Sequence, residues 1–571
     1  MNNAPVASTA VAALWSPPSG SGTGTVYPLL SQPVGLGVWV VAMGVQSATA
    51  GSGPAPVGLL FPGFGAVAAP DQPADIDAPS LEVRVSDRGW IGEPSDSGEP
   101  NVPYPARLAE PVTLESRLPV WPDDARRLTI DAGEVRLLNG DGYFDDLAGD
   151  WTIAGQTVTV RRGPHRRPVH AASGDFVLLA TYRAAGAAVG TSRLAVTLRP
   201  VGADVAVSVC ATYAGTGGID GAAALKGQYK PRLFGKKRNV EPVQIDPSLL
   251  IYQIHDGAMN GISAVRDRGV ALTGAGDVAD YATLAAATVT AGTYQTCLAV
   301  GCLRVGAVPS SLTVDATGDA EAATGGYNAG TATSIARKLL EGPGGVGSVD
   351  AAAFDWPGGE CGLFLRGGTV VDAMDALARG VFGWWGTDTA GAYRGGRLAA
   401  PELDASPFII QESMLGAPPE EIGPARAPWW TARVAYQTLG RVQTSEELAG
   451  SVTAANREYY GTASRYASAA DGAIATAYPG ATEGVEIPSV FDLEVDAQAV
   501  ADDVLAMFGR PRRAFRVTMR SGAAGFCWPS LQVGAAVSLV WSRHRALVNG
   551  RPMIVVGVSS RGDATTLTLW G

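Results

Sequence analysis

KPRLFGKKRNVEPVQIDPSLLIYQIHDGAMNGISAVRDRGVAL, residues 230–272, is the stretch that decides the fold. It begins with a run that is expected to form a basic loop, whose charged residues are Lys230, Arg232, Lys236, Lys237 and Arg238. Two short apolar runs follow, residues 249–254 and 261–265, and their β-branched and aromatic content predicts strands. Asp256-Gly257 lies between them and predicts a turn, because glycine tolerates positive φ. The stretch therefore predicts a β-rich domain.

The composition is that of a folded chain with many turns. The 571 residues are 46% hydrophobic, and this length is enough for roughly three to four domains. Glycine (73) and proline (38) favour short strands joined by turns over long helices. The net charge of −11 argues against nonspecific nucleic-acid binding as the main role, since such binding needs a basic face. An acidic wall does suit a conduit along which DNA passes without sticking.

The N-terminus carries no charged side chain before Asp71. A secretory signal needs a basic n-region, and a membrane helix needs about 20 apolar residues, whereas the best run, 34–43, has about ten. An exposed surface arm and a lipid-interacting segment are two interpretations. The favoured one is an arm buried against neighbouring subunits, because Trp39, Phe61 and Phe64 are costly to leave in water.

Residues 133–147, GEVRLLNGDGYFDDL, predict a strand that ends in a tight turn. A calcium-binding EF-hand loop starting at Asn139 needs glycine at its sixth position and glutamate at its twelfth. The sequence has Phe144 and Asp150 there. The segment is therefore interpreted as a structural turn and not as a metal site.

Helical and strand patterns mark the second half of the chain. Helices are expected at 333–340, 370–377 and 496–508, the last with Val500, Val504, Met507 and Phe508 on one face. Alternation in 515–519 and apolar runs at 537–541, 552–558 and 565–570 predict a small closing sheet. Its last strand needs a partner on each side to avoid an exposed edge.

The sequence contains no pattern typical of a catalytic, cofactor or metal site. The nucleophile-elbow, P-loop, dinucleotide-binding, HExxH and CxxC motifs are all missing. The five cysteines are scattered, and Cys297 and Cys302 match neither a CxxC pair nor a zinc spacing, so no disulfide framework is expected. Adjacent carboxylates point apart on a strand or helix, which disfavours acid/base pairs at 145/146, 420/421 and 502/503. We expect no enzyme activity, catalytic residue, cofactor or metal.

Three segments resemble one family. The elements KPxLFGxxRNVxP and LIYQxHDG, within 230–257, resemble the tail hub or tail-tip proteins of long-tailed bacteriophages and gene transfer agents. Residues 133–145 are similar to that family's early turn element, and residues 301–315 to its GxxRLxxxPxGxLTxDxxG element, with Val305 for leucine and a shorter stretch after Pro309. The positions that carry the resemblance are Gly133, Asn139, Asp141, Gly142, Asp145, Lys230, Pro231, Phe234, Gly235, Asn239, Val240, Tyr252, Asp256 and Gly257.

The resemblance implies a multidomain fold that is mainly β with α+β insertions. Small tail-tube-like β-barrels are expected to form a ring in a homotrimer. The expected parts are an uncharged Gly/Ala-rich arm (1–70), the first part of a hub β-barrel (71–215), an inserted β-rich domain (216–330), an α+β domain (331–484), and a helix with closing strands that complete a barrel (485–571).

The function implied by the resemblance is structural. Such a hub, assembled in the host cytoplasm, closes the distal end of the tail tube in the virion. It would contact the distal tail protein, the tape measure protein and the central fibre or receptor-binding proteins. The host envelope would be touched only indirectly, and genomic DNA would pass without specific binding. Two alternatives remain: a virion-associated cell-wall or capsule hydrolase, and a receptor-binding tail fibre protein.

Overall fold

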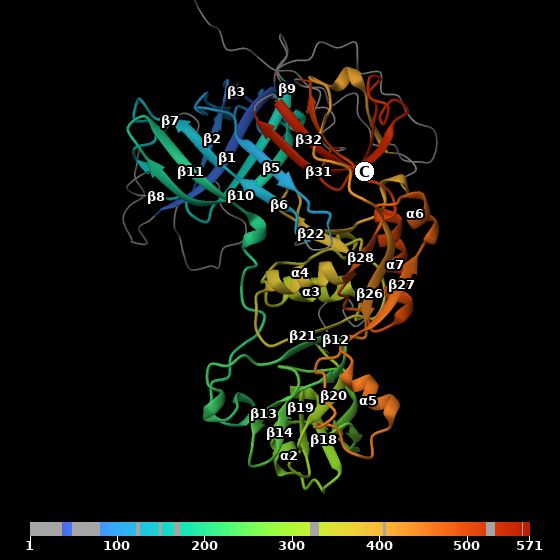
Figure 1. Ribbon diagram of the computed structural model, residues 1–571. Helices are drawn as coiled ribbons and strands as arrows, with labels where there is room; N and C mark the ends of the chain where they lie inside the picture. Colours follow the sequence, from blue (N-terminus) through green and yellow to red (C-terminus); the bar gives the residue numbers. More distant parts are fainter. Residues whose placement is uncertain are drawn as a thin grey trace, which may run out of the picture.

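The computed structural model describes residues 37–47, 80–121, 126–147, 151–164, 172–319, 330–403, 407–520, 531–561 and 564–571. Within these ranges the chain is mainly β, with several separate sheets and short helices between them, which confirms the expected fold class. Figure 1 shows two sheets side by side at one end, a helical layer in the middle, and a second β-rich part at the other end.

The first sheet curls around its own core. Its order is β2-β1-β9-β10-β11-β7, and β8 pairs with β1. The bounds are β1 (Gly37–Ser47), β2 (Ser80–Ser86), β7 (Glu134–Leu138), β8 (Trp151–Thr152), β9 (Thr157–Pro164), β10 (Val177–Val189) and β11 (Arg193–Pro200). Residues 105–109 hydrogen-bond both to Ser86 at the end of β2 and to residues 136–138 of β7. This segment completes a circuit of backbone hydrogen bonds. A short ribbon, β3 (Trp90–Ile91) with β4 (Pro103–Tyr104), lies beside it.

The expected N-terminal arm needs a correction here. Residues 37–47 form strand β1, which pairs with β2 and β9 in the interior of this sheet. Val41 and Met43 are fully buried in the core of the same chain. This part of the apolar run is therefore covered by its own sheet. The rest of 1–79, with Phe61 and Phe64, lies outside the described residues.

The second sheet contains the predicted closing strands. Its order is β24-β30-β31-β32-β29-β25. The bounds are β24 (Phe408–Ile410), β25 (Glu420–Glu421), β29 (Ala514–Met519), β30 (Ala536–Leu539), β31 (Arg551–Arg561) and β32 (Ala564–Trp570). The final strand β32 lies between β31 and β29, so both of its edges are paired, and Phe515, Val517 and Met519 are buried as predicted. Residues 408–421 supply both edge strands, which lie at opposite edges.

A hairpin joins the two sheets. Strand β5 (Thr113–Arg117) pairs with residues 557–561 of β31 and with β6 (Thr129–Ala132). On the other side, Tyr182 of β10 donates its hydroxyl to the carbonyl of Asp131 in β6. Figure 1 shows β5 between the sheets. The hairpin therefore belongs to the second sheet by strand pairing and contacts the first sheet through β6.

The middle layer holds the helices. It contains α3 (Ala332–Glu341), α4 (Val370–Gly380) and α7 (Glu494–Phe508), which confirm the three predicted helices, with α6 (Gly472–Ala477), whereas α5 (Ala454–Gly461) lies beside the end domain (Figure 1). α7 packs with its four predicted apolar residues buried against the sheet β27-β26-β28, whose strands are β26 (Trp429–Tyr436), β27 (Arg465–Ala470) and β28 (Thr482–Ile487). β22 (Gly383–Thr387) and β23 (Tyr393–Arg397) form a hairpin, and Figure 1 shows β22 between β6 and α4.

Two expected boundaries differ from this arrangement. The boundary at 484/485 separates α7 from the sheet on which it packs. The expected α+β range 331–484 also includes β24 and β25, which belong to the second curled sheet. Both differences arise because strand pairing across the chain, and not sequence proximity, decides which elements share a core.

In the described residues, none of the helices is long and apolar enough to cross a membrane.

The remaining part contains two five-stranded sheets. One has the order β16-β15-β20-β12-β21, and the other β13-β14-β19-β18-β17. The bounds are β12 (Arg232–Val240), β13 (Val243–Asp246), β14 (Ile251–Gln253), β15 (Gly261–Asp267), β16 (Val270–Ala271), β17 (Thr273–Asp277), α2 (Tyr281–Ala286), β18 (Thr293–Cys297), β19 (Cys302–Val305), β20 (Leu312–Thr317) and β21 (Gly362–Leu365). β14 and β15 confirm the two strands predicted in 249–265.

Candidate functional site: the β12 junction

Strand β12 changes partners at Gly235. Residues 232–235 pair with β21 from the middle layer, and residues 236–240 pair with β20 of the end domain. Gly235 has φ of +62°, and a Cβ placed there would lie 2.0 Å from the carbonyl oxygen of Cys361. Any other residue would overlap that oxygen in a backbone conformation that side chains disfavour. The glycine in KPxLFG is thus required where one strand joins two parts of the molecule.

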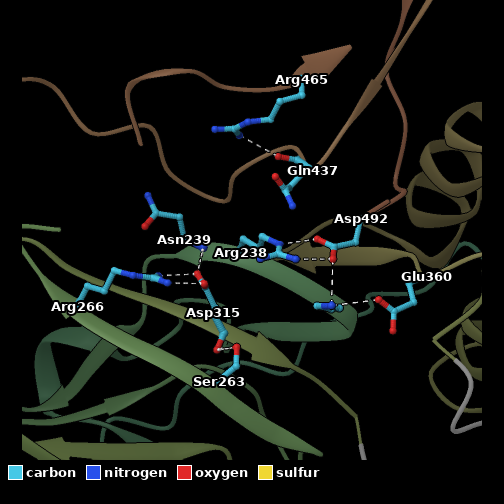
Figure 2. Close-up of polar contacts among 10 residues, drawn as sticks. Arg238, Asn239, Ser263, Arg266, Asp315, Glu360, Gln437, Arg465 and Asp492 are labelled. Atoms are coloured by element: carbon cyan, nitrogen blue, oxygen red, sulfur yellow. Dashed lines mark hydrogen bonds and ion pairs between the residues drawn. The ribbon is translucent and has the colours of Figure 1, made fainter. Parts of the chain in front are cut away.

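Asn239 fixes the far end of β12. It has φ of 51° and is fully buried. Its N–H donates to Asp315 Oδ1 at 2.8 Å, and its side-chain amide donates to the carbonyl of Arg441 at 2.7 Å. Asp315 also accepts two hydrogen bonds from Arg266, at 2.8 and 2.7 Å, as Figure 2 shows. Asparagine is one of the residues that tolerate this backbone region while offering a local donor.

The basic residues expected in a loop lie instead at the start of and along strand β12, which is a correction. Arg238 makes a bidentate ion pair with Asp492 at 2.7 and 2.8 Å, and Lys236 contacts both Asp492 (3.1 Å) and Glu360 (3.0 Å) (Figure 2). Burial alone would raise the pKa of Asp492, but the hydrogen bonds from Arg238 and Lys236 together hold it below its usual range. Burial also lowers the pKa of Lys237 to about 8.

The remaining two basic residues are also paired. Lys230 is buried and contacts Asp220 at 2.9 Å and Asp256 at 3.6 Å. Arg232 contacts Asp319 at 3.4 Å. Residues 230–238 look like a basic patch in the sequence because their acidic partners come from other segments of the chain. In the folded protein these cations hold segments together and do not form an anion-binding face.

The HDG element, His255-Asp256-Gly257, hydrogen-bonds to the chain at the start of β12. His255 is buried, and its Nδ1 accepts the N–H of Leu233 at 3.0 Å. Burial lowers the pKa of His255 to about 3, so the imidazole is neutral, as this hydrogen bond requires. The N–H of Asp256 donates to the carbonyl of Pro231 at 2.8 Å, and Gly257 has φ of 121°. The predicted turn at Asp256-Gly257 is thus tied to β12.

Three further motif positions of this group have packing roles. Phe234 is buried in the core of the middle layer, whereas Val240 is buried in the core of the end domain. Tyr252 accepts a hydrogen bond at its hydroxyl from Gln244 at 3.0 Å. Successive residues of β12 therefore reach the cores of both parts that the strand joins.

The early turn has its own closed network. Asn139 is buried and accepts the N–H of Phe144 at 2.7 Å, while its amide donates to Asp145 at 2.8 Å and to the carbonyl of Gly190 at 2.9 Å. Gly142 has φ of +73°, as a turn of this kind requires.

Around this turn, polar contacts tie in the edge of the first sheet. Asp141 makes a bidentate ion pair with Arg107, from the segment that closes the sheet, at 2.6 and 2.7 Å. The carbonyl of Gly133 accepts the N–H of Leu198. The side-chain oxygens of Asn139, Asp141 and Asp145 therefore accept hydrogen bonds from groups of the same chain. Among the described residues, no group of three or more His, Cys, Asp or Glu side chains is placed to hold a metal ion.

The motif positions fall into two separate groups. Those at 133–145 belong to the first curled sheet, and those at 230–257 belong to the β12 junction, near the opposite end of the molecule (Figure 1). Asp315, from the third segment that resembles the family, is the partner of Asn239. No pattern in the sequence points to Asp492, whose partner Arg238 lies 254 residues away.

Two of the three carboxylate pairs considered for acid/base chemistry contribute to ion pairs. Glu420 contacts Arg516 at 2.9 Å, and Glu421 contacts Arg513 at 2.6 Å. Asp503 pairs with Arg397. Trp429 packs on Phe508 with ring centroids 4.5 Å apart. These contacts are those of structural residues.

A small hollow lies beside β12. It has a volume of about 110 Å³ and is lined by residues that include Phe234, Lys236, Lys338 and Glu360. Ligand pockets are typically about 300–1,000 Å³. Its lysines are paired, Lys236 with Glu360 and Lys338 with Asp319. The hollow is therefore smaller than a typical ligand pocket.

No protein-family model matches the sequence, and no curated protein matches it. Solved structures that it resembles include the 43 kDa tail protein of prophage MuSo2 from Shewanella oneidensis, at 12% identity over 80% of this chain and 93% of that chain, with a TM-score of 0.36. Another is the tail protein from Neisseria meningitidis MC58, at 10% identity over 81% and 95%, with a TM-score of 0.36. The P2 virion baseplate in its activated conformation aligns at 9% identity over 80% and 98%, with a TM-score of 0.18. TM-scores this low do not establish a shared fold.

Proposed function

We propose that this chain is a structural subunit of the tail tip of a long-tailed phage or gene transfer agent particle. In this proposal it is a hub that closes the distal tail tube in the virion. The observation that carries the proposal is the pair of β-sheets linked through the β5–β6 hairpin in one chain. Three copies supply six such sheets, which suits a pseudo-sixfold ring that continues a tail tube.

The junction at β12 supports this role. A hub must transmit force between the tube above and the fibre parts below without coming apart. A strand that pairs with β21 along its first half and with β20 along its second, with ion pairs from Arg232 to Asp319 and from Arg238 to Asp492, resists separation of the parts it joins. The residues that resemble the hub family, such as Gly235 and Asn239, are the ones on which that shared strand depends.

The partners follow from the same proposal. The ring would contact the distal tail protein on one side and the central fibre or receptor-binding proteins on the other. Its channel would hold the tape measure protein and then pass the genomic DNA. The net charge of −11 suits that passage, because an acidic surface repels phosphate. The host envelope would be reached only through the attached fibres.

The test is the oligomer of the purified full chain, by native mass spectrometry and by negative-stain imaging. We expect a closed trimer with an axial channel wide enough for a DNA duplex. In particles, labelled antibody against the chain should bind the distal end of the tail. A monomer that degrades cell-wall or capsule polymer, a solid spike, or a complete tail tip in particles lacking the chain would each overturn the proposal.

A further inference from the structure

Strands β18 and β19 place two cysteines directly opposite each other. Cys297 is the last residue of β18 and Cys302 the first of β19, and they are partners in the antiparallel register. Both are fully buried in the same small core, together with Tyr213 and Ile251. Residues opposite each other on antiparallel strands point to the same face of the sheet. The two thiols therefore share one side of one hairpin.

The hydrogen-bond pattern fixes the type of this pair. Gly306 donates its N–H to the carbonyl of Thr293, so residues 293 and 306 form a bonded pair. Bonded pairs recur at every second position, which places 297 and 302 in another. Such residues have Cα atoms about 5.5 Å apart, and disulfides span about 4.4–6.8 Å. The Cβ atoms must approach each other by about 1 Å for a bond to form.

The short turn between the strands brings the sulfur atoms together. Cys302 donates its thiol to the carbonyl of Val300 at 3.4 Å. Burial raises the pKa of the Cys297 thiol, while the backbone N–H groups of Val300 and Ala299 act against this rise. Both sulfur atoms thus approach the same turn residue.

We propose that Cys297 and Cys302 form a reversible disulfide when the protein meets an oxidising medium. The two thiols lose two protons and two electrons and form one S–S bond. The oxidant is a small disulfide such as oxidised glutathione, which is reduced to two thiols by exchange. A virion component released from a reducing cytoplasm meets such conditions, and this setting, though not the chemistry, rests on the proposed function.

The bond has a structural consequence at the β12 junction. The carbonyl of Gly301, beside Cys302, accepts the N–H groups of Ile254 and His255. A disulfide across this turn holds Gly301 in place and thereby holds the HDG element on β12. Because both thiols are buried, the reaction waits for local opening of the hairpin and is slow. Because the strands must approach to make it, the bond is readily reduced.

Peptide mapping tests this directly. The full chain is incubated with oxidised glutathione until the reaction stops, then unfolded, alkylated and digested with trypsin. Cys297 and Cys302 lie in one tryptic peptide, residues 269–304, because no Lys or Arg separates them. We expect this peptide to lose both labels and about 2 Da, the mass of two hydrogens, and to regain both labels after a reducing agent.

Two variants make the result specific. Cys302→Ala should give no peptide with the 2 Da loss, because Cys297 then has no second thiol to displace glutathione from a mixed disulfide. Cys361→Ala, which removes another buried cysteine, should leave the oxidised peptide unchanged. Native-state hydrogen exchange at Ile254 and His255 should slow after oxidation. In the wild-type chain, a 269–304 peptide that keeps both labels at the end of the reaction would overturn the proposal. So would a wild-type Cys297 linked at that point to glutathione or to a cysteine other than Cys302. Neither result bears on the tail-tip assignment, which the oligomer test decides separately.

Discussion

Gly235 is a position where a single methyl group should separate two parts of the molecule. Replacing it with alanine forces a positive φ on a residue with a side chain and pushes Cβ into the carbonyl of Cys361. We expect Gly235→Ala to lower the free energy of unfolding by about 3 kcal/mol or more. Chemical denaturation followed by circular dichroism measures it.

Gly140 is the matched control for this substitution. A Cβ there meets nothing within 4 Å. Gly140→Ala should therefore change the free energy of unfolding by less than about 0.5 kcal/mol. Equal losses in the two variants would show that the change of strand partner at Gly235 does not need glycine.

Asp492 is the acidic group that holds the basic face of β12. Asp492→Asn leaves Arg238 and Lys236 without their shared buried carboxylate, and we expect a loss of about 2 kcal/mol. Glu420→Gln, which breaks an exposed pair with Arg516, should lose less than about 1 kcal/mol. Thermal unfolding of the wild type and both variants measures the two losses, and the loss in Asp492→Asn should be the larger.

The difference in the free energy of unfolding between wild type and Asp492→Asn should depend on pH in a definite direction. The pKa of Asp492 is lowered in the folded state, so its carboxylate stabilises the protein fully above the unfolded value of about 3.9. That stabilisation is lost as pH falls through the lowered folded pKa. The difference in stability between wild type and Asp492→Asn should therefore be constant from pH 7 to about 5 and shrink below about pH 4. A difference that grows on acidification would contradict the ion pair.

At the scale of elements, β5 joins the two curled sheets. Glu115 lies at its centre, opposite Ser559 of β31 on one side and Asp131 of β6 on the other. Proline at this position removes a donor from a strand that is paired on both edges. We expect Glu115→Pro to increase hydrogen exchange in β6 and in residues 557–561, and to abolish the trimer of the proposed hub.

Ala275→Pro is the control at the same scale. Ala275 is exposed on the edge strand β17, within the irregularity between Gly274 and Asp277. Proline is tolerated at edges and bulges. This variant should keep hydrogen exchange and oligomeric state close to those of the wild type. Loss of the trimer in both variants would mean that β5 has no special place in the assembly.

At the scale of the whole molecule, the sheet that contains β12 crosses the expected domain boundary. β21 supplies its last strand from residues 362–365, and Phe234 of β12 is buried in the core of the middle layer. A fragment of residues 216–330 therefore lacks a strand and exposes apolar surface. We expect it to be insoluble or to show poor dispersion of its amide NMR signals.

A longer fragment, residues 204–509, keeps both strands and the helices α3, α4 and α7. It should unfold cooperatively on heating. A shorter fragment with native-like signals would contradict the view that the end domain depends on the middle layer. The two fragments differ in whether the partner of residues 232–235 is present, so their comparison isolates that strand.

The sequence by itself determined the local structure. Apolar residues spaced as in α7 and alternating as in β29 appear as predicted, and glycine sets the turns after Asp141 and Asp256, because these features depend on backbone geometry over a few residues. The sequence also marked Gly235 and Asn239 as motif positions, but it did not show why these two residues are required there.

Only the tertiary structure decided which elements pair. It placed β1 inside a sheet instead of an arm, turned a basic run into a strand whose Arg232 and Arg238 pair with Asp319 and Asp492, and set Cys297 opposite Cys302. Local propensity cannot fix these contacts, because the gain from burying a distant partner depends on the complete fold and on the entropy of closing the chain between them.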